Sequence, residues 1–461
     1  MRFREYLDDL KGSRVAVVGA GISNTPLIEA LLAAGIDTTI CDKQTSDEIG
    51  EAASRFESMG AQVRLGKNYL DNLQADIIFR TPGLMPWNSA IAEATFEGAV
   101  LTSEMEAFFD VCPCKIIAVT GSDGKTTTTS IIADILKKEG RMVHVGGNIG
   151  TPLLCCADDM SPDDIAVLEL SSFQLVTMKK SPDVAVITNI SPNHLDIHSD
   201  FKEYIEAKRN IYVHQNSSGK AIFNLDNSYT RNFAESAPGE VLFFSRHEKV
   251  SNGVYADNEM IYESVGGSCE AIMRSGEILL PGMHNLENYL AAFAAVRGLA
   301  GYSSMLETAR TFRGVPHRAE LVRELCGVRY YNDSIATSPT RTIAGLRSFD
   351  KKVILIAGGK DKGVEFDELG SEIIAHVKRL VLTGLTAEKI RASVMNAPGY
   401  SQEPEIIMRE DFKEAVLAAA QSANDGDIVL LSPACTSFDR FRNFEERGDF
   451  FREIVMRLDS V

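Results

Sequence analysis

The residues best suited to chemistry lie in one short stretch, Thr120-Gly121-Ser122-Asp123-Gly124-Lys125-Thr126-Thr127. Glycine-rich backbone exposes N–H groups that can cradle phosphate oxygens, and the N-terminus of a following helix adds positive potential. Lys125 can reach the β- and γ-phosphates of a nucleotide, and the Thr126 hydroxyl can ligate Mg²⁺. The stretch therefore predicts an ATP- and Mg²⁺-binding phosphate loop. The alternative is a plain strand-to-helix turn.

The elements around this loop favour the phosphate-binding interpretation. Residues 116–119 are apolar and mostly β-branched, which predicts a buried strand. Apolar residues recur with helical spacing over 131–136, and Gly140 would end that helix. The loop itself is unusual, because only two residues separate Gly121 from Gly124, whereas the common motif has four.

Polar side chains also follow two further predicted strands, 165–168 and 184–187. Ligands bind at the carboxyl ends of parallel strands, so we expect Glu169 and His194 near the loop. Glu169 offers a hard oxygen ligand for Mg²⁺, although a carboxylate paired with a lysine is the simpler alternative. His194 would complete a second metal shell or bind a substrate oxygen, or else it is an ordinary loop histidine. Lys208, on a predicted helix over 201–213, would by itself be a surface lysine.

The N-terminal region predicts a βαβ unit. A strand over 14–18 leads into Gly19-Ala20-Gly21-Ile22-Ser23-Asn24, and a second strand over 38–41 ends at Asp42. This resembles the dinucleotide fingerprint, in which an acidic residue follows the glycines by about 20 residues. Asn24 stands where the third glycine belongs, which weakens an NAD or FAD interpretation. A different nucleotide held by the same geometry remains plausible.

The remaining pattern extends this α/β organisation to the whole chain. We predict three domains: a Rossmann-like domain over 1–107, a central P-loop ATPase-like domain over 108–314, and a second Rossmann-like domain over 315–461. The central domain would have a parallel sheet and a β-rich extension from about 220 to 280, where turn residues interrupt short strands. In the last domain, strands are predicted at 328–331, 352–357, 380–382 and 428–431.

Composition limits the classes of partner. The net charge of −17 over 461 residues is unfavourable for binding nucleic acid or an anionic membrane. No apolar run approaches the roughly 18 residues of a membrane span, and the N-terminus has no signal-peptide core, so we expect a cytoplasmic protein. As a separate expectation, we predict a monomer. The eight cysteines, including Cys112-Pro113-Cys114 and Cys155-Cys156, lack zinc-site spacing and are predicted to be reduced.

Six strings together resemble the Mur ligases of peptidoglycan synthesis, and they occur in the family's order. These strings are T-G-S-D-G-K-T-T from Thr120, G-G-N-I-G from Gly146, E-L-S-S-F-Q-L from Glu169, P-N-H-L-D from Pro192, P-H-R from Pro316 and N-D-S from Asn332. The C-terminal strings L-S-P-A-C-T-S-F-D-R-F and F-E-E-R-G are similar to those of the member that adds D-glutamate. The resemblance covers all three predicted domains, from Gly19 to Gly448.

This resemblance implies an ATP-dependent ligase that adds D-glutamate to UDP-N-acetylmuramoyl-L-alanine through an acyl phosphate. It implies that Thr126 and Glu169 bind one Mg²⁺, and that His194 and a carbamylated Lys208 serve a second. Lys125, His194 and Lys208 would be catalytic. The implied ATP contacts are Gly121, Ser122, Asp123, Gly124, Lys125, Thr126, Thr127, Asn285, Arg318 and Asp333. The implied UDP-sugar contacts are Ile22, Ser23, Asp42, Lys43, Gly83 and Asn148, and those for D-glutamate are Thr337, Lys362, Ser437 and Phe438.

Two positions depart from the family pattern. Ile335 stands where many members have a lysine, and Asn193 where many have an aspartate. Three alternatives remain: another amino-acid-adding ligase of the superfamily, including the folylpolyglutamate synthetases; a P-loop switch or regulatory ATPase; and a nicotinamide-dependent dehydrogenase.

Overall fold

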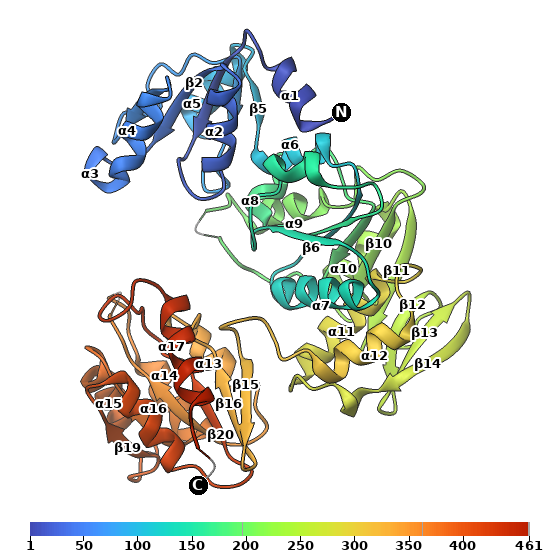
Figure 1. Ribbon diagram of the computed structural model, residues 1–461. Helices are drawn as coiled ribbons and strands as arrows, with labels where there is room; N and C mark the ends of the chain where they lie inside the picture. The colour runs from blue at the N-terminus through green and yellow to red at the C-terminus, as the bar shows by residue number, and fades with distance from the viewer. Residues whose placement is uncertain (196, 362, 460–461) are drawn as a thin grey trace. The chain divides into compact units, whose positions relative to one another are not determined.

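The computed structural model describes residues 1–195, 197–361 and 363–459, and it contains three β-sheets with helices packed on them (Figure 1). The first sheet has five parallel strands in the order β3-β2-β1-β4-β5. Its strands are β1 (Arg14–Val18), β2 (Asp37–Asp42), β3 (Gln62–Leu65), β4 (Ile77–Phe79) and β5 (Val100–Thr102). The helices of this region are α1 (Phe3–Asp9), α2 (Thr25–Ala33), α3 (Ser46–Ile49), α4 (Glu51–Ser58), α5 (Ser89–Phe96) and α6 (Glu104–Val111).

The continuous apolar run of β1 is explained by burial on both faces. Val15 and Val17 pack in one core with Leu27 of α2. Ala16 and Val18 pack in another, with Ile78 and Ile91. A parallel sheet covered on both faces needs apolar residues at consecutive positions, which is why this strand shows no polar alternation.

The central sheet has nine strands in the order β14-β13-β12-β11-β10-β9-β6-β8-β7. They are β6 (Lys115–Thr120), β7 (Val143–Gly147), β8 (Ile165–Glu169), β9 (Val184–Ile187), β10 (Lys220–Asn224), β11 (Glu240–Ser245), β12 (Gly253–Asp257), β13 (Met260–Val265) and β14 (Ser268–Arg274). Pairing is parallel from β7 to β12 and antiparallel from β12 to β14, which confirms the β-rich extension.

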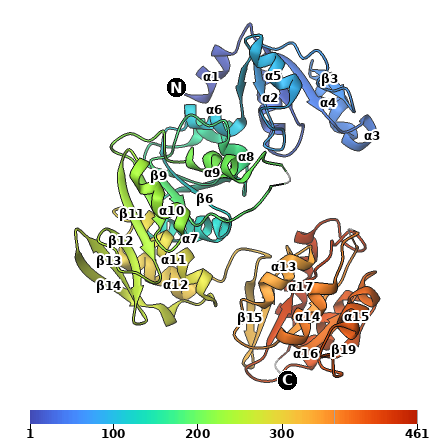
Figure 2. The same ribbon diagram turned by 180° about the vertical axis from the view of Figure 1, so that it is seen from behind.

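Helices cover both faces of this sheet. They are α7 (Lys125–Lys138), α8 (Ser172–Leu175), α9 (Phe201–Arg209), α10 (Ser228–Phe233), α11 (Met283–Ala295) and α12 (Tyr302–Thr311), with 3₁₀ turns at Leu154–Asp159, Ala234–Ser236 and Ser275–Glu277. Figure 2, seen from behind, shows the face that α9 and α10 cover. On that face, Ile116 and Ala118 of β6 share a core with Tyr204 of α9.

The register of the central strands brings the predicted chemical residues to one edge. Val119 in β6 pairs with Glu169 in β8, and Thr120 pairs with Ile187 in β9. The phosphate loop, Glu169 and the segment after β9 therefore begin at the same level of the sheet.

The third sheet has six strands in the order β15-β16-β20-β17-β18-β19, and all pairs except β15–β16 are parallel. The strands are β15 (Glu320–Leu325), β16 (Val328–Asn332), β17 (Val353–Ala357), β18 (Val377–Leu382), β19 (Glu405–Met408) and β20 (Ile428–Leu431). Its helices are α13 (Pro339–Leu346), α14 (Asp367–His376), α15 (Ala387–Asn396), α16 (Phe412–Gln421) and α17 (Phe444–Met456).

The chain forms two compact units, one of residues 1–275 and 287–308, the other of residues 276–286 and 309–461. The exact domain boundaries proposed from the sequence stay a prediction. One helix range differs from expectation: the helix predicted over 201–213 ends at Arg209. The apolar residues after Arg209 lie in turns. The backbone N–H of Ile211, for example, donates to the carbonyl of Lys208, three residues back.

Candidate active site

The phosphate loop has a backbone that only glycine fits at two positions. Gly121 and Gly124 have φ of 152° and 79°. A Cβ atom at Gly121 would overlap Thr188 Oγ1, and one at Gly124 would overlap the side-chain oxygen of Asn288. The short spacing of the loop therefore fits close packing against the segment after β9 and against α11.

The loop is held in shape by hydrogen bonds from outside it. Ser122 Oγ lies 2.8 Å from Tyr204 Oη and accepts from the backbone N–H of Ser191 at 2.9 Å. The backbone N–H of Asp123 donates to Asn189 Oδ1 at 2.9 Å. Lys125 Nζ donates to the carbonyl of Gly121 at 3.0 Å, so the lysine lies along the loop, where phosphate oxygens would be bound.

Glu169, at the end of β8, is 1% exposed and has one oxygen left for a ligand. Its Oε1 accepts from Asn148 Nδ2 at 2.8 Å. Its Oε2 is buried and has no hydrogen-bond partner among the described residues. A buried carboxylate oxygen without a partner is costly, and Mg²⁺ prefers such hard oxygen ligands, so Glu169 and the buried Thr126 fit a magnesium ion.

Lys208 is buried, which the sequence alone did not indicate. Its Nζ donates to the carbonyl of Gly121 at 2.8 Å and to Thr120 Oγ1 at 3.2 Å, and it lies 4.8 Å from the ring centroid of Tyr204. Desolvation lowers the pKa of this ammonium well below its usual value, and the charge of Lys125 lowers it further. Asp123 and Glu169 oppose that shift. A buried lysine that loses its proton readily is a nucleophilic amine.

His194 lies on an exposed loop with φ of 56°, and its ring contacts the edge of Phe173, with 5.0 Å between ring centroids. A second histidine, His198, continues this contact inside the protein. Its ring stacks on Phe173 with centroids 5.3 Å apart, and its Nε2 lies 2.9 Å from Ser172 Oγ. Sequence reasoning missed His198, although its place four residues after His194, just before α9, was a signal.

His198 also connects to the loop through Tyr204. The two rings meet edge to face, with 5.4 Å between centroids, and Tyr204 Oη reaches Ser122. His198 Nδ1 lies 3.5 Å from Glu203 Oε1. Desolvation lowers the pKa of His198, so this buried ring is predominantly neutral near pH 7.

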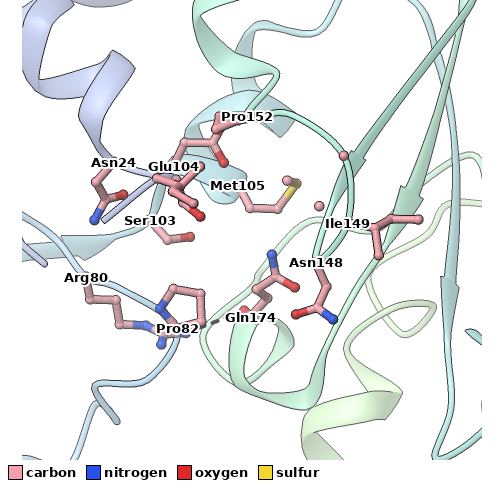
Figure 3. Close-up of a pocket in the computed structure, with 14 residues that line it drawn as sticks. Asn24, Arg80, Pro82, Ser103, Glu104, Met105, Asn148, Ile149, Pro152 and Gln174 are labelled. Carbon is pink, nitrogen blue, oxygen red and sulfur yellow. Dashed lines mark hydrogen bonds between the residues drawn. The ribbon is translucent and has the colours of Figure 1, made fainter. Parts of the chain in front are cut away.

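A cavity of about 230 Å³ lies beside this site, lined by the segments that follow β1, β4 and β7 and by residues of α6 and α8 (Figure 3). It brings together three residues that the sequence assigned to the UDP-sugar, namely Ile22, Ser23 and Asn148. Lys43 and Gly83 are exposed and are not among its lining residues. Asp42 is also outside the lining: its carboxylate accepts from the backbone N–H groups of Ala20 and Gln44.

Asn24 explains why the third glycine is missing. Its side chain is buried, and Nδ2 donates to the carbonyls of Val18 at 3.2 Å and Gly19 at 2.9 Å. The asparagine thus closes the strand-to-helix turn by hydrogen bonds, where a glycine would allow close backbone packing.

Two charged residues in the cavity wall were not predicted. Arg80 is 1% exposed, and its guanidinium donates to the carbonyl of Phe173 at 2.7 Å and to Thr177 Oγ1 at 2.9 Å. Glu104 is buried, and desolvation raises the pKa of its carboxyl to about 7, although Oε1 accepts from the backbone N–H of Leu154 at 3.1 Å. The domain boundary predicted from the sequence falls at residues 107/108, whereas these residues belong to α6, which contains the buried Glu104.

The second unit contains the remaining nucleotide candidates. Asp333, after β16, is buried, with Oδ2 accepting from Ser432 Oγ at 2.8 Å and Oδ1 accepting from the backbone N–H of Ala319 at 3.2 Å. Burial raises the pKa of Asp333 to about 7, and Arg318 opposes this shift. Asn285 Nδ2 donates to the carbonyl of Pro281 at 2.6 Å, which ties it to the turn before α11.

The residues assigned to D-glutamate also lie in the second unit. Ser437 is buried, Thr337 is half-buried and Phe438 is 62% exposed. Lys362 lies outside the described residues. Arg447 of α17 was not predicted: this buried guanidinium donates from Nε to Ser334 Oγ at 2.9 Å and from Nη1 to the carbonyl of Cys435 at 3.1 Å.

Two features are absent from the described residues. No group of three or more His, Cys, Asp or Glu side chains there is arranged to hold a metal ion. The magnesium site inferred above has a single carboxylate, so it is not of this kind. In the same part of the chain, every helix is too short or too polar to cross a membrane.

Comparison with known proteins gives matches over the whole chain. Family models of the Mur ligase middle domain and of the Mur ligase glutamate ligase domain match residues 119–296 and 317–435. The chain is 48% identical over 460 residues to the UDP-N-acetylmuramoylalanine–D-glutamate ligase of Clostridium novyi (strain NT), covering 99% of each chain. It is 49% identical over 456 residues to that of Clostridium kluyveri (strain ATCC 8527), covering 98% of each.

Solved structures share the fold at lower identity. The UDP-N-acetylmuramate-alanine ligase from Thermotoga maritima is 18% identical, with a TM-score of 0.56 over 96% of this chain and 99% of that one. MurF from Acinetobacter baumannii is 17% identical, with a TM-score of 0.57 over 78% and 82% of the two chains.

Proposed function

Because this chain belongs to the Mur ligase family, we propose that it joins D-glutamate to UDP-N-acetylmuramoyl-L-alanine in peptidoglycan precursor synthesis, with conversion of ATP to ADP and phosphate. Identity of 47–49% to ligases of that name, over nearly the whole chain, supports these substrates. One structural observation carries the phosphoryl-transfer chemistry: the buried Glu169 Oε2, without a hydrogen-bond partner among the described residues, at the sheet edge where the phosphate loop begins.

The proposed reaction has two steps. The alanine carboxylate of the nucleotide precursor attacks the γ-phosphorus of ATP, ADP leaves, and an acyl phosphate forms. The amine of D-glutamate then attacks the acyl carbon, phosphate leaves, and an amide remains. Both steps build up charge on phosphoryl oxygens, so cationic groups and loop N–H groups beside them stabilise the transition state.

The first unit supplies the groups for this stabilisation. Lys125 and the loop from Gly121 to Thr127 would bind the ATP phosphates. Glu169 and Thr126 would hold Mg²⁺, which would neutralise part of the phosphate charge. His194 and Lys208 would serve a second ion.

Lys208 would be a suitable ligand for Mg²⁺ after modification, because this ion prefers oxygen ligands and lysine has none. We propose that its amine adds to carbon dioxide, loses a proton and becomes a carbamate, whose oxygens are anionic. Burial beside Thr120 and Gly121 supports this, since it favours the neutral amine. In ¹³C-bicarbonate, the enzyme should give a carbamate NMR signal that is missing in Lys208→Ala. A wild-type spectrum without that signal would contradict the carbamate.

The remaining site residues complete the proposal. We assign Asn285, Arg318 and Asp333 to the nucleotide, and Thr337, Lys362, Ser437 and Phe438 to D-glutamate. We assign Ile22, Ser23, Asp42, Lys43, Gly83 and Asn148 to the UDP-sugar; the cavity that Ile22, Ser23 and Asn148 line supports this. The use of ATP and a nucleotide-sugar supports action in the cytoplasm. A monomeric state stays a prediction.

A panel of co-substrates tests the function. Phosphate release from ATP is measured with each nucleotide precursor and each amino acid in turn. We expect release only when UDP-N-acetylmuramoyl-L-alanine and D-glutamate are both present. A requirement for a folate acceptor would favour a folylpolyglutamate synthetase, and release independent of both co-substrates would favour a regulatory ATPase.

The dehydrogenase alternative is tested by binding. The first βαβ unit should bind the UDP-sugar and not NAD. Tight NAD binding without binding of the UDP-sugar would overturn our assignment of the first sheet.

A further inference from the structure

Cys112 and Cys114, at the junction of α6 and β6, form a thiol pair that the proposed ligase reaction does not use. Their Sγ atoms lie 3.5 Å apart. Cys112 follows α6 with extended backbone angles, φ −62° and ψ 120°, and Pro113 fixes the next φ in a similar region. Side chains two residues apart on extended backbone point the same way, so the Cys-Pro-Cys sequence itself directs the two thiols together.

The two thiols of the pair differ in exposure and in the direction of their pKa shifts. Cys112 is half-buried and accessible to a small reagent, whereas Cys114 is 7% exposed. A hydrogen bond from the Cys112 thiol lowers the pKa of Cys114, and the backbone N–H of Ala166 acts in the same direction. The same hydrogen bond, together with burial, raises the pKa of Cys112.

We propose that Cys112 and Cys114 form a thiol–disulfide exchange site for low-molecular-weight disulfides such as glutathione disulfide. One thiol of the pair, as the thiolate, attacks one sulfur of the reagent, which forms a mixed disulfide and releases one small thiolate. The other thiol of the pair then attacks the protein sulfur of this mixed disulfide, so the protein disulfide forms and a second small thiolate leaves. The two thiol protons end on the released thiolates, so two protein thiols and one small disulfide give one protein disulfide and two small thiols.

The bond would lie between two elements that lead to the site. It would join the C-terminal end of α6 to the start of β6. Ser103 and Glu104, at the other end of α6, line the cavity, and β6 leads directly into the phosphate loop.

The sequence provides a clean assay, because trypsin releases the pair in one peptide. Thr81–Lys115 contains Cys112 and Cys114 and no other cysteine. The full-length folded protein is incubated with increasing ratios of glutathione disulfide to glutathione, its free thiols are alkylated, and the digest is analysed by mass spectrometry. We expect most of this peptide to lose two hydrogen atoms, to escape alkylation, and to return to the dithiol after treatment with a dithiol reductant.

The adjacent Cys155 and Cys156 give a matched control in the peptide Met142–Lys179. Cys156 is exposed, and two adjacent cysteines close into a ring only with strain, so this peptide should carry bound glutathione instead. In Cys112→Ser, the first peptide should never lose two hydrogens. The proposal is overturned if Thr81–Lys115 remains a dithiol, or carries only glutathione, at ratios that modify Cys156.

Discussion

At the scale of single residues, the candidate active site places the side chains of two lysines and a glutamate close together, and two of the three, Lys208 and Glu169, are buried. Lys125 and Glu169 both lie close enough to Lys208 to shift its pKa: the charge of Lys125 lowers it and that of Glu169 raises it. Lys208 is buried against Thr120 and Gly121, whereas Lys125 lies along the loop where phosphate would be bound. The two lysines meet at the carbonyl of Gly121 but differ in their other partners, because only Lys208 also bonds Thr120 Oγ1.

Lys125→Ala should lower the rate of ATP-dependent phosphate release by about 10²-fold or more, because it removes a positive charge from the site of phosphoryl transfer. Steady-state turnover with both co-substrates measures this effect. Lys137→Ala is the control, since Lys137 is exposed on the same helix. Full activity in Lys125→Ala would remove this lysine from the mechanism.

Glu169→Gln should raise the Mg²⁺ concentration needed for half-maximal turnover by about tenfold or more, because a neutral amide is a weaker ligand than a carboxylate. Asn148 can still bond the Gln side chain, so the fold should be retained. A magnesium titration at saturating ATP measures the shift. An unchanged titration curve would place the metal elsewhere.

At the scale of elements, aromatic side chains of α8, of α9 and of the segment between them hold the loops that follow the central parallel strands. Phe173, His198 and Tyr204 form a continuous ring contact that ends at Ser122 of the phosphate loop. Because the ring of His194 meets that of Phe173 edge to face, Phe173 also contacts the loop that carries this candidate metal ligand.

His198→Ala should lower the free energy of unfolding by about 2–4 kcal/mol, since it empties a buried ring site and removes a hydrogen bond to Ser172. Turnover should fall as well, because Tyr204 and Phe173 lose their packing. Urea unfolding and phosphate release are the measurements. His214→Ala, an exposed histidine after α9, should change neither quantity. Equal behaviour of the two variants would contradict a positioning role for His198.

At the scale of the molecule, the chain divides between two compact units. The phosphate loop, Glu169, Lys208 and the cavity belong to the first, whereas Arg318, Asp333, Ser437 and Arg447 belong to the second. Each unit contains a buried carboxyl group whose pKa is raised: Glu104 in the first unit and Asp333 in the second. We therefore expect the stability of each unit to depend on pH in the neutral range.

Glu104→Gln should reveal this sensitivity in the first unit. Burial raises the pKa of Glu104 from 4.5 to about 7, so the folded state holds a proton that the unfolded state releases at lower pH. This contribution to stability is complete below about pH 4.5 and is lost as the pH rises through 7.

The free energy of unfolding of the variant, relative to that of wild type, should therefore rise by about 2 kcal/mol as the pH is raised from about 5 to about 7.5. Urea unfolding followed through Trp87 fluorescence measures the difference, with the exposed Glu97→Gln as control. A difference that does not change with pH would show that Glu104 does not titrate in this range.

The sequence predicted most elements because their signals are local. The apolar runs of β1, β6, β8 and β9 needed burial on both faces, and the structure confirms this. Helix α6 was missed because its acidic start and its proline-flanked end suggested a boundary. Arg80, Glu104, His198 and Arg447 were missed because a charged or polar residue gives no sequence signal of its own burial.

The sequence by itself determined the chemistry that is available: a glycine loop with a lysine and a threonine, a carboxylate after a strand, and an ordered set of family motifs. Those features depend on residue type and spacing along the chain. The tertiary structure alone decided which groups are desolvated and which meet. Lys208 became a buried amine, Glu169 retained an unpaired oxygen and Asn24 replaced a glycine by bonding the turn, because packing between distant segments sets solvation and partners.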